Sequence, residues 1–157
     1  MADQEFDGVE GLMQEPEAVP GGGPARLTLF LLCDRAEILK DKLYIMGGGI
    51  RTFNARSFPA QIRFSIAIEV LVPWAETNRE IPLEFRFETA DGQHIGSAGI
   101  QFAHGRPPLL RGEDQHAMFA ISDLALGVPE TSQLVAIASI DGKEQRRITF
   151  QVQAAGG

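Results

Sequence analysis

The sequence predicts an all-β fold, a two-sheet antiparallel β-sandwich of about eight strands, with closure into a β-barrel as the alternative. Apolar and polar residues alternate over several stretches, which is the period of a strand; a helical reading of these stretches would bury their charges. Asp-Gly dipeptides, typical of tight hairpin turns, separate some of the stretches. Turn signals recur about every 8 to 15 residues, the spacing of short strands.

Residues 1–24 are predicted to be a disordered acidic tail that ends in a flexible linker. They contain six acidic residues and no Lys or Arg, and positions 20–24 read Pro-Gly-Gly-Gly-Pro. The few apolar residues cannot offset the conformational entropy lost on ordering such a segment. The alternative is a short peptide that folds on a partner, because Phe6, Val9, Leu12 and Met13 fall on one face of a helix.

Residues 25–153 are expected to form a single domain, followed by a short flexible C-terminus at 154–157. The chain has 157 residues and 44% hydrophobic content, enough to bury a core without disulfides. Its first element is an apolar hairpin within residues 27–53. Because six of the seven residues at 27–33 are apolar, we expect a central strand that is covered on both faces.

Two segments within residues 27–53 are less regular. Residues 35–40 are helix formers and predict one helical turn before the second strand. The three glycines at 47–49 follow that strand without completing a phosphate-binding motif. They predict a bulge or a bend that carries the chain from one sheet to the other.

The clearest alternation lies in three later segments, 61–72, 83–88 and 147–152. Their apolar faces predict a shared core that includes Phe64, Ile66, Phe85 and Phe150. The dipeptides at 91–92 and 141–142 predict two hairpins with type I′ turns. Residues 113–126 and 132–141 supply two more strands, while 73–78 and 105–108 are expected to be loops.

Charge and cysteine content exclude several classes of function. The net charge of −7 resides mainly in the acidic tail, and the rest of the chain has 15 acidic and 14 basic residues. A nearly neutral body argues against binding to nucleic acid or to anionic membranes. No apolar stretch is long enough for a membrane helix, no secretory signal is recognisable, and a single cysteine forms no internal disulfide. We therefore expect a protein of the reducing cytoplasm.

Candidate catalytic and metal-ligating residues form no convincing constellation. Cys33 could be a nucleophile, but no base lies near it in sequence and Asp34 opposes thiolate formation, so we expect a buried structural thiol. His94, His104 and His116 lack the short spacing of metal-ligand pairs and are expected at surfaces or turns. The sequence thus predicts no enzyme, no cofactor and no metal.

Two loops carry the residue types that most often anchor binding. Trp74 lies among polar residues that include Asn78 and Arg79, and a second loop contains Arg106 and Arg111. Tryptophan and arginine combine contact area with hydrogen bonding, as protein or sugar recognition requires. The candidate binding surface is therefore Trp74, Asn78, Arg79, Arg106 and Arg111. The alternative is that Trp74 folds back as a lid over one end of the sandwich.

Four short motifs resemble an uncharacterised bacterial family, catalogued as a domain of unknown function. They are Leu-Cys-Asp at 32–34, Asp-Lys-Leu-Tyr-Ile-Met-Gly at 41–47, Val-Pro-Trp at 72–74 and Gly-Arg-Pro-Pro at 105–108. Asp41 stands where the family usually has glycine, and aspartate also suits a turn position. The resemblance covers most of residues 27–152. It implies one compact β domain in a bacterial cytoplasm and transfers no catalytic residues.

The sequence is most consistent with a non-catalytic protein-interaction or structural module that binds an unknown protein partner. The alternative is a small-ligand or carbohydrate-binding module that uses the loops of Trp74 and Arg106. An enzyme is the least favoured class, because a fold by itself indicates no catalytic activity and no set of catalytic residues is recognisable.

Overall fold

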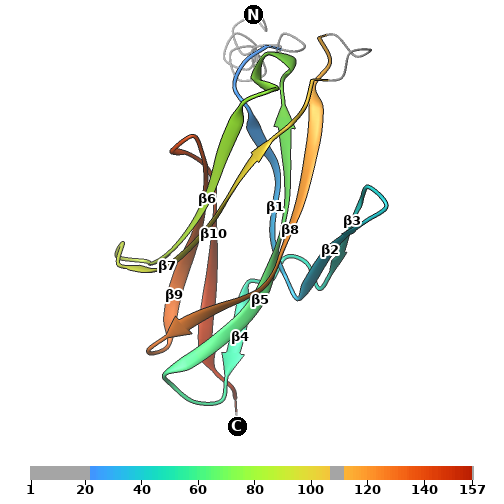
Figure 1. The fold of residues 1–157 in the computed structure, drawn as a ribbon. Helices are drawn as coiled ribbons and strands as arrows, with labels where there is room; N and C mark the ends of the chain where they lie inside the picture. Colours follow the sequence, from blue (N-terminus) through green and yellow to red (C-terminus); the bar gives the residue numbers. More distant parts are fainter. Residues whose placement is uncertain (1–21, 107–111, 157) are drawn as a thin grey trace, which may run out of the picture.

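The structure is a computed structural model that describes residues 22–106 and 112–156. In this part of the chain the regular elements are ten β-strands and one short 3-10 turn, so the fold is all-β (Figure 1). The 3-10 turn is η1 (Trp74–Glu76), inside the expected loop at 73–78. The strands are β1 (Arg26–Cys33), β2 (Arg35–Leu39), β3 (Lys42–Met46), β4 (Thr52–Ala55), β5 (Ala60–Val72), β6 (Glu80–Thr89), β7 (His94–Ala103), β8 (Gln115–Val128), β9 (Ser132–Ile140) and β10 (Lys143–Ala154).

The described strands form three sheets, whereas the sequence predicted about eight strands in two. One sheet has the order β1-β5-β8, the second has the order β4-β10-β9-β6-β7, and β2 and β3 form a small sheet of their own. The arrangement is also not wholly antiparallel, because β4 runs parallel to β10. No hairpin joins these two strands, so the connection does not dictate their relative direction.

One apolar core lies between the three-stranded and the five-stranded sheets. Phe64 and Ile66 enter it from β5, and Phe85 and Phe150 enter it from β6 and β10; all four are at most 2% exposed. Aromatic rings link the two sheets, with 5.5 Å between the ring centroids of Phe64 and Phe87. The core residues predicted from alternation are therefore confirmed.

The opening hairpin differs from the prediction in its partners. The first apolar strand, β1, pairs with β5 rather than with β3, and it is an edge strand of its sheet. It is nevertheless covered on both faces, because Leu32 enters the main core while Cys33 lies beneath the β2–β3 hairpin. Burial on both faces was thus predicted correctly, but the inference of a central strand was wrong.

The predicted helical turn at residues 35–40 is wrong, because this segment contains strand β2, paired with β3. Lys40 and Asp41 connect the two strands with φ angles of 49° and 60°. Positive φ at both central positions is the type I′ geometry that matches strand twist. Pairing with β3 and packing on the three-stranded sheet outweigh the weak helix propensity of these residues.

The two hairpin turns predicted from Asp-Gly dipeptides agree with the structure in part. Asp141 and Gly142 join β9 to β10 with φ angles of 52° and 76°, as expected for a type I′ turn. The connection between β6 and β7 is a wider loop in which Gly92 has a positive φ and Asp91 does not. There Thr89 accepts a hydrogen bond of 3.0 Å from the amide of Gln93. The second predicted hairpin therefore exists without the predicted turn type.

The last strand extends one residue beyond the expected boundary at residue 153. Ala154, predicted to begin a flexible C-terminus, is the last residue of β10. The amide of the next residue, Ala155, donates a 2.8 Å hydrogen bond to the carbonyl of Ala55. Residues 1–21 of the predicted disordered tail lie outside the described residues. No helix in the described ranges is long and apolar enough to cross a membrane.

Candidate functional site

The structure brings together the two loops that the sequence singled out. The guanidinium carbon of Arg106 lies 3.8 Å from the centroid of the Trp74 ring. The Nε of Arg106 donates to Thr77 Oγ1 over 2.9 Å, and its backbone amide donates to Asn78 Oδ1 over 3.0 Å. We call Trp74, Thr77, Asn78 and Arg106 the end-loop cluster. Three of the five predicted binding residues thus belong to one cluster.

Within the end-loop cluster, the two expected anchors contact each other. The guanidinium covers one face of the Trp74 ring, a cation–π arrangement that is favourable in itself. The ring is half-buried, and its Nε1 is a buried donor with no hydrogen-bond partner among the described residues. One stacking face of the Trp74 ring is therefore occupied by the protein itself.

Arg79, the fourth predicted residue, is engaged by two carboxylates. Its guanidinium forms an ion pair with Glu76 and two hydrogen bonds to Asp141, of 2.6 and 3.1 Å. The hydrogen bonds from Arg79 hold the pKa of Asp141 below its usual value. The side chain therefore ties η1 to the β9–β10 turn. Arg111 lies in the segment 107–111, outside the described residues.

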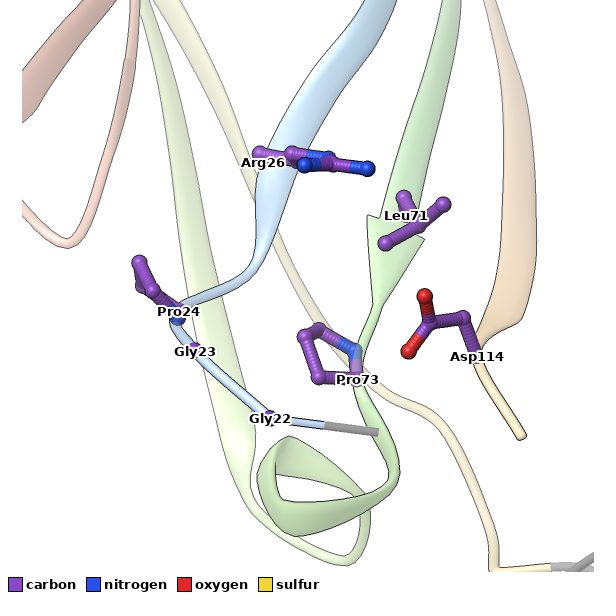
Figure 2. A pocket seen from close by; sticks show the side chains of 7 residues that line it. All are labelled: Gly22, Gly23, Pro24, Arg26, Leu71, Pro73 and Asp114. Atoms are coloured by element: carbon purple, nitrogen blue, oxygen red, sulfur yellow. The ribbon is translucent and has the colours of Figure 1, made fainter. Parts of the chain in front are cut away.

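A shallow hollow of about 390 Å³ lies near the start of β1 (Figure 2). Arg26 and Asp114 supply its charged groups, and Leu71 and Pro73 lie between them in the figure. Glycine and proline residues at 22–24 complete the lining. This lining contains no nucleophile paired with a base, so it indicates no reaction.

The most exposed apolar surface lies on the β2–β3 hairpin, a region that the sequence did not mark as a site. Among the described residues, the exposed large hydrophobic side chains are all on this hairpin: Ile38 (41%), Leu39 (55%), Tyr44 (46%) and Met46 (51%). In Figure 1 the hairpin stands out to one side of the two larger sheets.

The register of the hairpin separates its side chains into two faces. Met46 lies opposite Arg35, Tyr44 opposite Glu37, and Leu39 opposite Lys42. Since directly opposed residues share a face of the sheet, these six side chains form what we call the hairpin outer face. Each of the three pairs therefore joins one apolar and one charged side chain on this exposed face.

The inner face of the hairpin fixes it to the three-stranded sheet. Ala36 is buried with Cys33 and Ala67, and Leu43 and Ile45 pack against this second, smaller core. Ser122 Oγ on β8 donates a 3.1 Å hydrogen bond to the carbonyl of Ala36. The hairpin is thus held by both apolar contact and hydrogen bonding.

The base of the hairpin explains two residues of the sequence motif, Asp34 and Gly47. The amide of Asp34 donates to the carbonyl of Met46 over 3.1 Å. Gly47 has a φ of 62°, and a Cβ at this position would lie 2.1 Å from Asp34 Oδ2. Only glycine satisfies both demands, since a side chain is strained at positive φ and would collide with the carboxylate.

Cys33 lies under the hairpin and lacks the surroundings of a nucleophile. It is completely buried, and its Sγ donates a 3.4 Å hydrogen bond to the carbonyl of Ser65. Burial, and to a lesser degree the charge of Asp34, raise the pKa of the thiol. A thiol in such surroundings is a poor nucleophile.

The histidines occupy separate places. His116 Nδ1 lies 3.2 Å from Glu69 Oε1, His94 begins β7, and the carbonyl of His104 accepts a hydrogen bond from Asn78. Glu69 also accepts a 2.8 Å hydrogen bond from Thr28, which is the main reason that its pKa is lowered. In the described part of the chain, no group of three His, Cys, Asp or Glu residues is arranged to hold a metal ion.

The hairpin outer face could have been found from the sequence had residues 35–46 been read as two strands. Leu39, Tyr44 and Met46 are large and apolar, and they lie in a segment that also supplies Ile38, Leu43 and Ile45. A two-stranded hairpin can bury only one of its faces on a domain. An excess of apolar residues on both faces therefore signals an apolar surface open to solvent.

No curated protein matches the chain. The alkylpurine DNA glycosylase AlkC of Pseudomonas fluorescens, bound to DNA containing an abasic site analog, aligns at 12% identity with a TM-score of 0.43, covering 85% of this chain and 31% of that chain. A putative beta-galactosidase from Bacteroides fragilis aligns at 14% identity with a TM-score of 0.37, covering 65% of this chain and 15% of that chain. Both scores are too low to support an argument about fold or function.

A family model provides the firmer result. It describes a family of unknown function, DUF6941, and it matches residues 28–153. The match runs from the third residue of β1 to the penultimate residue of β10, and it includes the hairpin with its anchoring residues Cys33, Asp34 and Gly47. The chain therefore belongs to the family of unknown function DUF6941.

Proposed function

We propose that this protein is a non-catalytic protein-interaction module, and that the hairpin outer face is its docking surface. The observation that carries the proposal is the exposure of Leu39, Tyr44 and Met46 on one side of a projecting hairpin. Soluble proteins seldom leave neighbouring large apolar side chains in water unless these side chains bind something.

The composition of the hairpin outer face fits a protein partner. Tyrosine and methionine are enriched at protein interfaces, and a tyrosine contributes contact area together with a hydroxyl group. The charged residues Arg35, Glu37 and Lys42 border the apolar ones on the same face. An apolar centre with polar neighbours is the usual anatomy of a binding patch.

The anchoring of the hairpin supports the same proposal. The small core around Cys33, the hydrogen bond from Ser122 and the fit of Gly47 against Asp34 hold the hairpin in one position. A preorganised surface loses little conformational entropy on binding, so more of the contact energy contributes to affinity.

The rest of the chain serves as the scaffold in this proposal. We propose that residues 25–153 are one domain, in which the three-stranded and five-stranded sheets act as the two layers of a β-sandwich. The shared core, to which both sheets contribute, supports this description. We propose no catalytic role, in keeping with the burial and raised pKa of Cys33.

A ligand- or carbohydrate-binding role for the end-loop cluster is less well supported. Sugar recognition by tryptophan requires an open ring face, and Arg106 covers one face of Trp74. The guanidinium of Arg79 is engaged by Glu76 and Asp141. In our proposal these residues stabilise the end of the domain.

The test compares two triple variants of the full chain in capture experiments from native lysate. The first, Leu39→Ser/Tyr44→Ser/Met46→Ser, removes the apolar side chains, and we expect it to lose the captured protein. The matched control, Arg35→Ser/Glu37→Ser/Lys42→Ser, alters the charged side chains of the same face and should retain most capture, since exposed charges contribute little affinity.

Circular dichroism and thermal melting would establish that both variants are folded. Retention of capture by the apolar triple variant would overturn the proposal. A loss caused by Trp74→Ala/Arg106→Ala, with the apolar triple variant unaffected, would instead place the protein-docking surface at the end-loop cluster.

A further inference from the structure

Strand β7 is an open sheet edge of unusual composition. It is the last strand of the five-stranded sheet and pairs with β6 alone among the described strands. Its 10 residues contain no Lys, Arg, Asp, Glu or Pro. An edge strand normally carries charges, prolines or bulges that prevent pairing with another chain.

Two other open edges of this protein carry such protection. The part of β10 that extends beyond β4 contains Lys143, Glu144, Arg146 and Arg147. On β8, Asp123 has a φ of 55° next to a shift in register, so the edge is both charged and distorted. The register shift of β7 lies at its start, where Phe87 pairs with Gly96 and Glu88 with His94. Residues 96–103 therefore form an uncharged and regular edge that is open to a further strand.

The outer face of β7 carries no bulky side chain near the middle of the strand. Ser97 and Gly99 are exposed there, opposite Arg86 and Glu84 of β6. Because Ser97 and Gly99 have small side chains or none, a hollow of about 400 Å³ lies between the two charged residues. The same strand turns Ala98 and Ile100 towards the apolar core.

We propose that β7 pairs with β7 of a second copy of this chain, antiparallel about a two-fold axis at Ala98. This register places Ser97 of one copy opposite Gly99 of the other. Each row across the joined sheets then reads Arg86, Ser97, Gly99 and Glu84, with the last two residues from the second copy. A cation thus stands at one end of each row and an anion at the other.

This charge pattern is what identifies the occupant as a second copy. Strands in a sheet lie about 4.8 Å apart, so the Cα atoms of Arg86 and the opposing Glu84 are separated by about 14 Å. The two residues between them, Ser97 and Gly99, offer no steric obstacle to the attraction between these long side chains. The competing partner of Arg86 is Glu88 on its own strand, at the long distance of 3.8 Å. The symmetry produces two such complementary rows in each dimer.

The pairing joins two five-stranded sheets through backbone hydrogen bonds and adds little buried area. Interfaces of this size are weak, so we infer an equilibrium between monomer and dimer that depends on protein concentration. This surface is separate from the hairpin outer face, and the inference does not depend on the proposed function.

Analytical ultracentrifugation of the full chain over a wide dilution series, at low ionic strength, tests the proposal. The wild type should dimerise. Arg86→Glu makes both ends of each row negative and Glu84→Arg makes both positive, so each variant should weaken the dimer about tenfold. A mixture of the two variants should recover the affinity, because each negative row end then meets a positive one.

Arg147→Glu is the matched control, since it makes the same charge change on the same sheet away from β7. It should dimerise as the wild type does. Hydrogen exchange should show concentration-dependent protection of the amides at 96–101. A wild type that remains monomeric up to millimolar concentration, equal effects of all three substitutions, or a mixture that fails to recover affinity would overturn the proposal. If the protein does not self-associate, but an added unrelated peptide protects the β7 amides from hydrogen exchange, then the occupant is a strand from another protein. That result would also overturn the proposal.

Discussion

At the residue scale, the motif Leu-Cys-Asp and the glycine at 47 serve the attachment of the hairpin. Leu32 enters the main core and Cys33 the smaller core, so two consecutive residues face opposite sides of β1. Asp34 occupies the space that a Cβ at Gly47 would fill. These residues therefore determine where the hairpin sits, and they supply no reactive group.

Cys33 should be inert in the folded protein. Its complete burial and the raised pKa of its thiol both reduce the population of accessible thiolate at neutral pH. A maleimide reagent should label the native protein slowly and the denatured protein quickly. The native rate should rise with pH, because a raised pKa places thiolate formation at higher pH. Rapid labelling of the native protein at neutral pH would show that the hairpin does not cover this residue.

Gly47→Ala should destabilise the protein by about 1 to 3 kcal/mol, because it adds strain at positive φ to a collision with Asp34. Gly49→Ala is the matched control. Gly49 also has a positive φ, of 82°, but a Cβ there would meet nothing within 4 Å. Chemical denaturation should show the larger loss for Gly47→Ala, and Asp34→Ala should lessen the difference. Equal losses at the two glycines would contradict the fit described for the hairpin base.

At the element scale, the sequence predicted best those strands whose burial is one-sided. The alternation of apolar and polar residues located β6 and β10 and the core-facing side chains of β5. Apolar residues at every second position indicate a strand with one buried face. The segment at 35–40 failed because helix propensity is a weak signal and its strand state depends on pairing with β3. The partners of β1 and β4 depend on long-range packing, which no local pattern records.

The sequence also predicted the candidate site only in part. Residue type alone identified Trp74 and Arg106, because aromatic residues and arginine are the side chains that most often anchor binding contacts. Their mutual stacking arises because the loops after β5 and β7 meet at one end of the domain. The hairpin outer face was missed because its segment was not recognised as two strands.

At the scale of the whole molecule, the protein consists of a well-buried body and an attached hairpin with an exposed apolar face. The body has one continuous core, in which Phe85 is completely buried and its ring lies 5.6 Å from that of Phe30 in the opposite sheet. The hairpin has a small core of its own. Loss of the hairpin contacts should therefore affect binding more than global stability.

Phe85→Ala should cost about 3 to 5 kcal/mol of folding free energy, as expected for a fully buried aromatic ring. Equilibrium unfolding in denaturant measures this loss directly. Tyr44→Ala, on the exposed hairpin outer face, is the comparison and should cost less than about 1 kcal/mol. A small cost for Phe85→Ala would mean that this ring does not contribute to the shared core.

The central claim, that the hairpin outer face binds a protein, is tested most directly by site-specific photocrosslinking. A photoreactive phenylalanine derivative replaces Tyr44 in one variant of the full chain and Arg147, on the five-stranded sheet, in another. After illumination in native lysate we expect a discrete covalent adduct from position 44 and none from position 147. Excess unlabelled wild type should compete for the adduct, whereas Leu39→Ser/Tyr44→Ser/Met46→Ser should not. No adduct from position 44, or equal adducts from both positions, would contradict the claim.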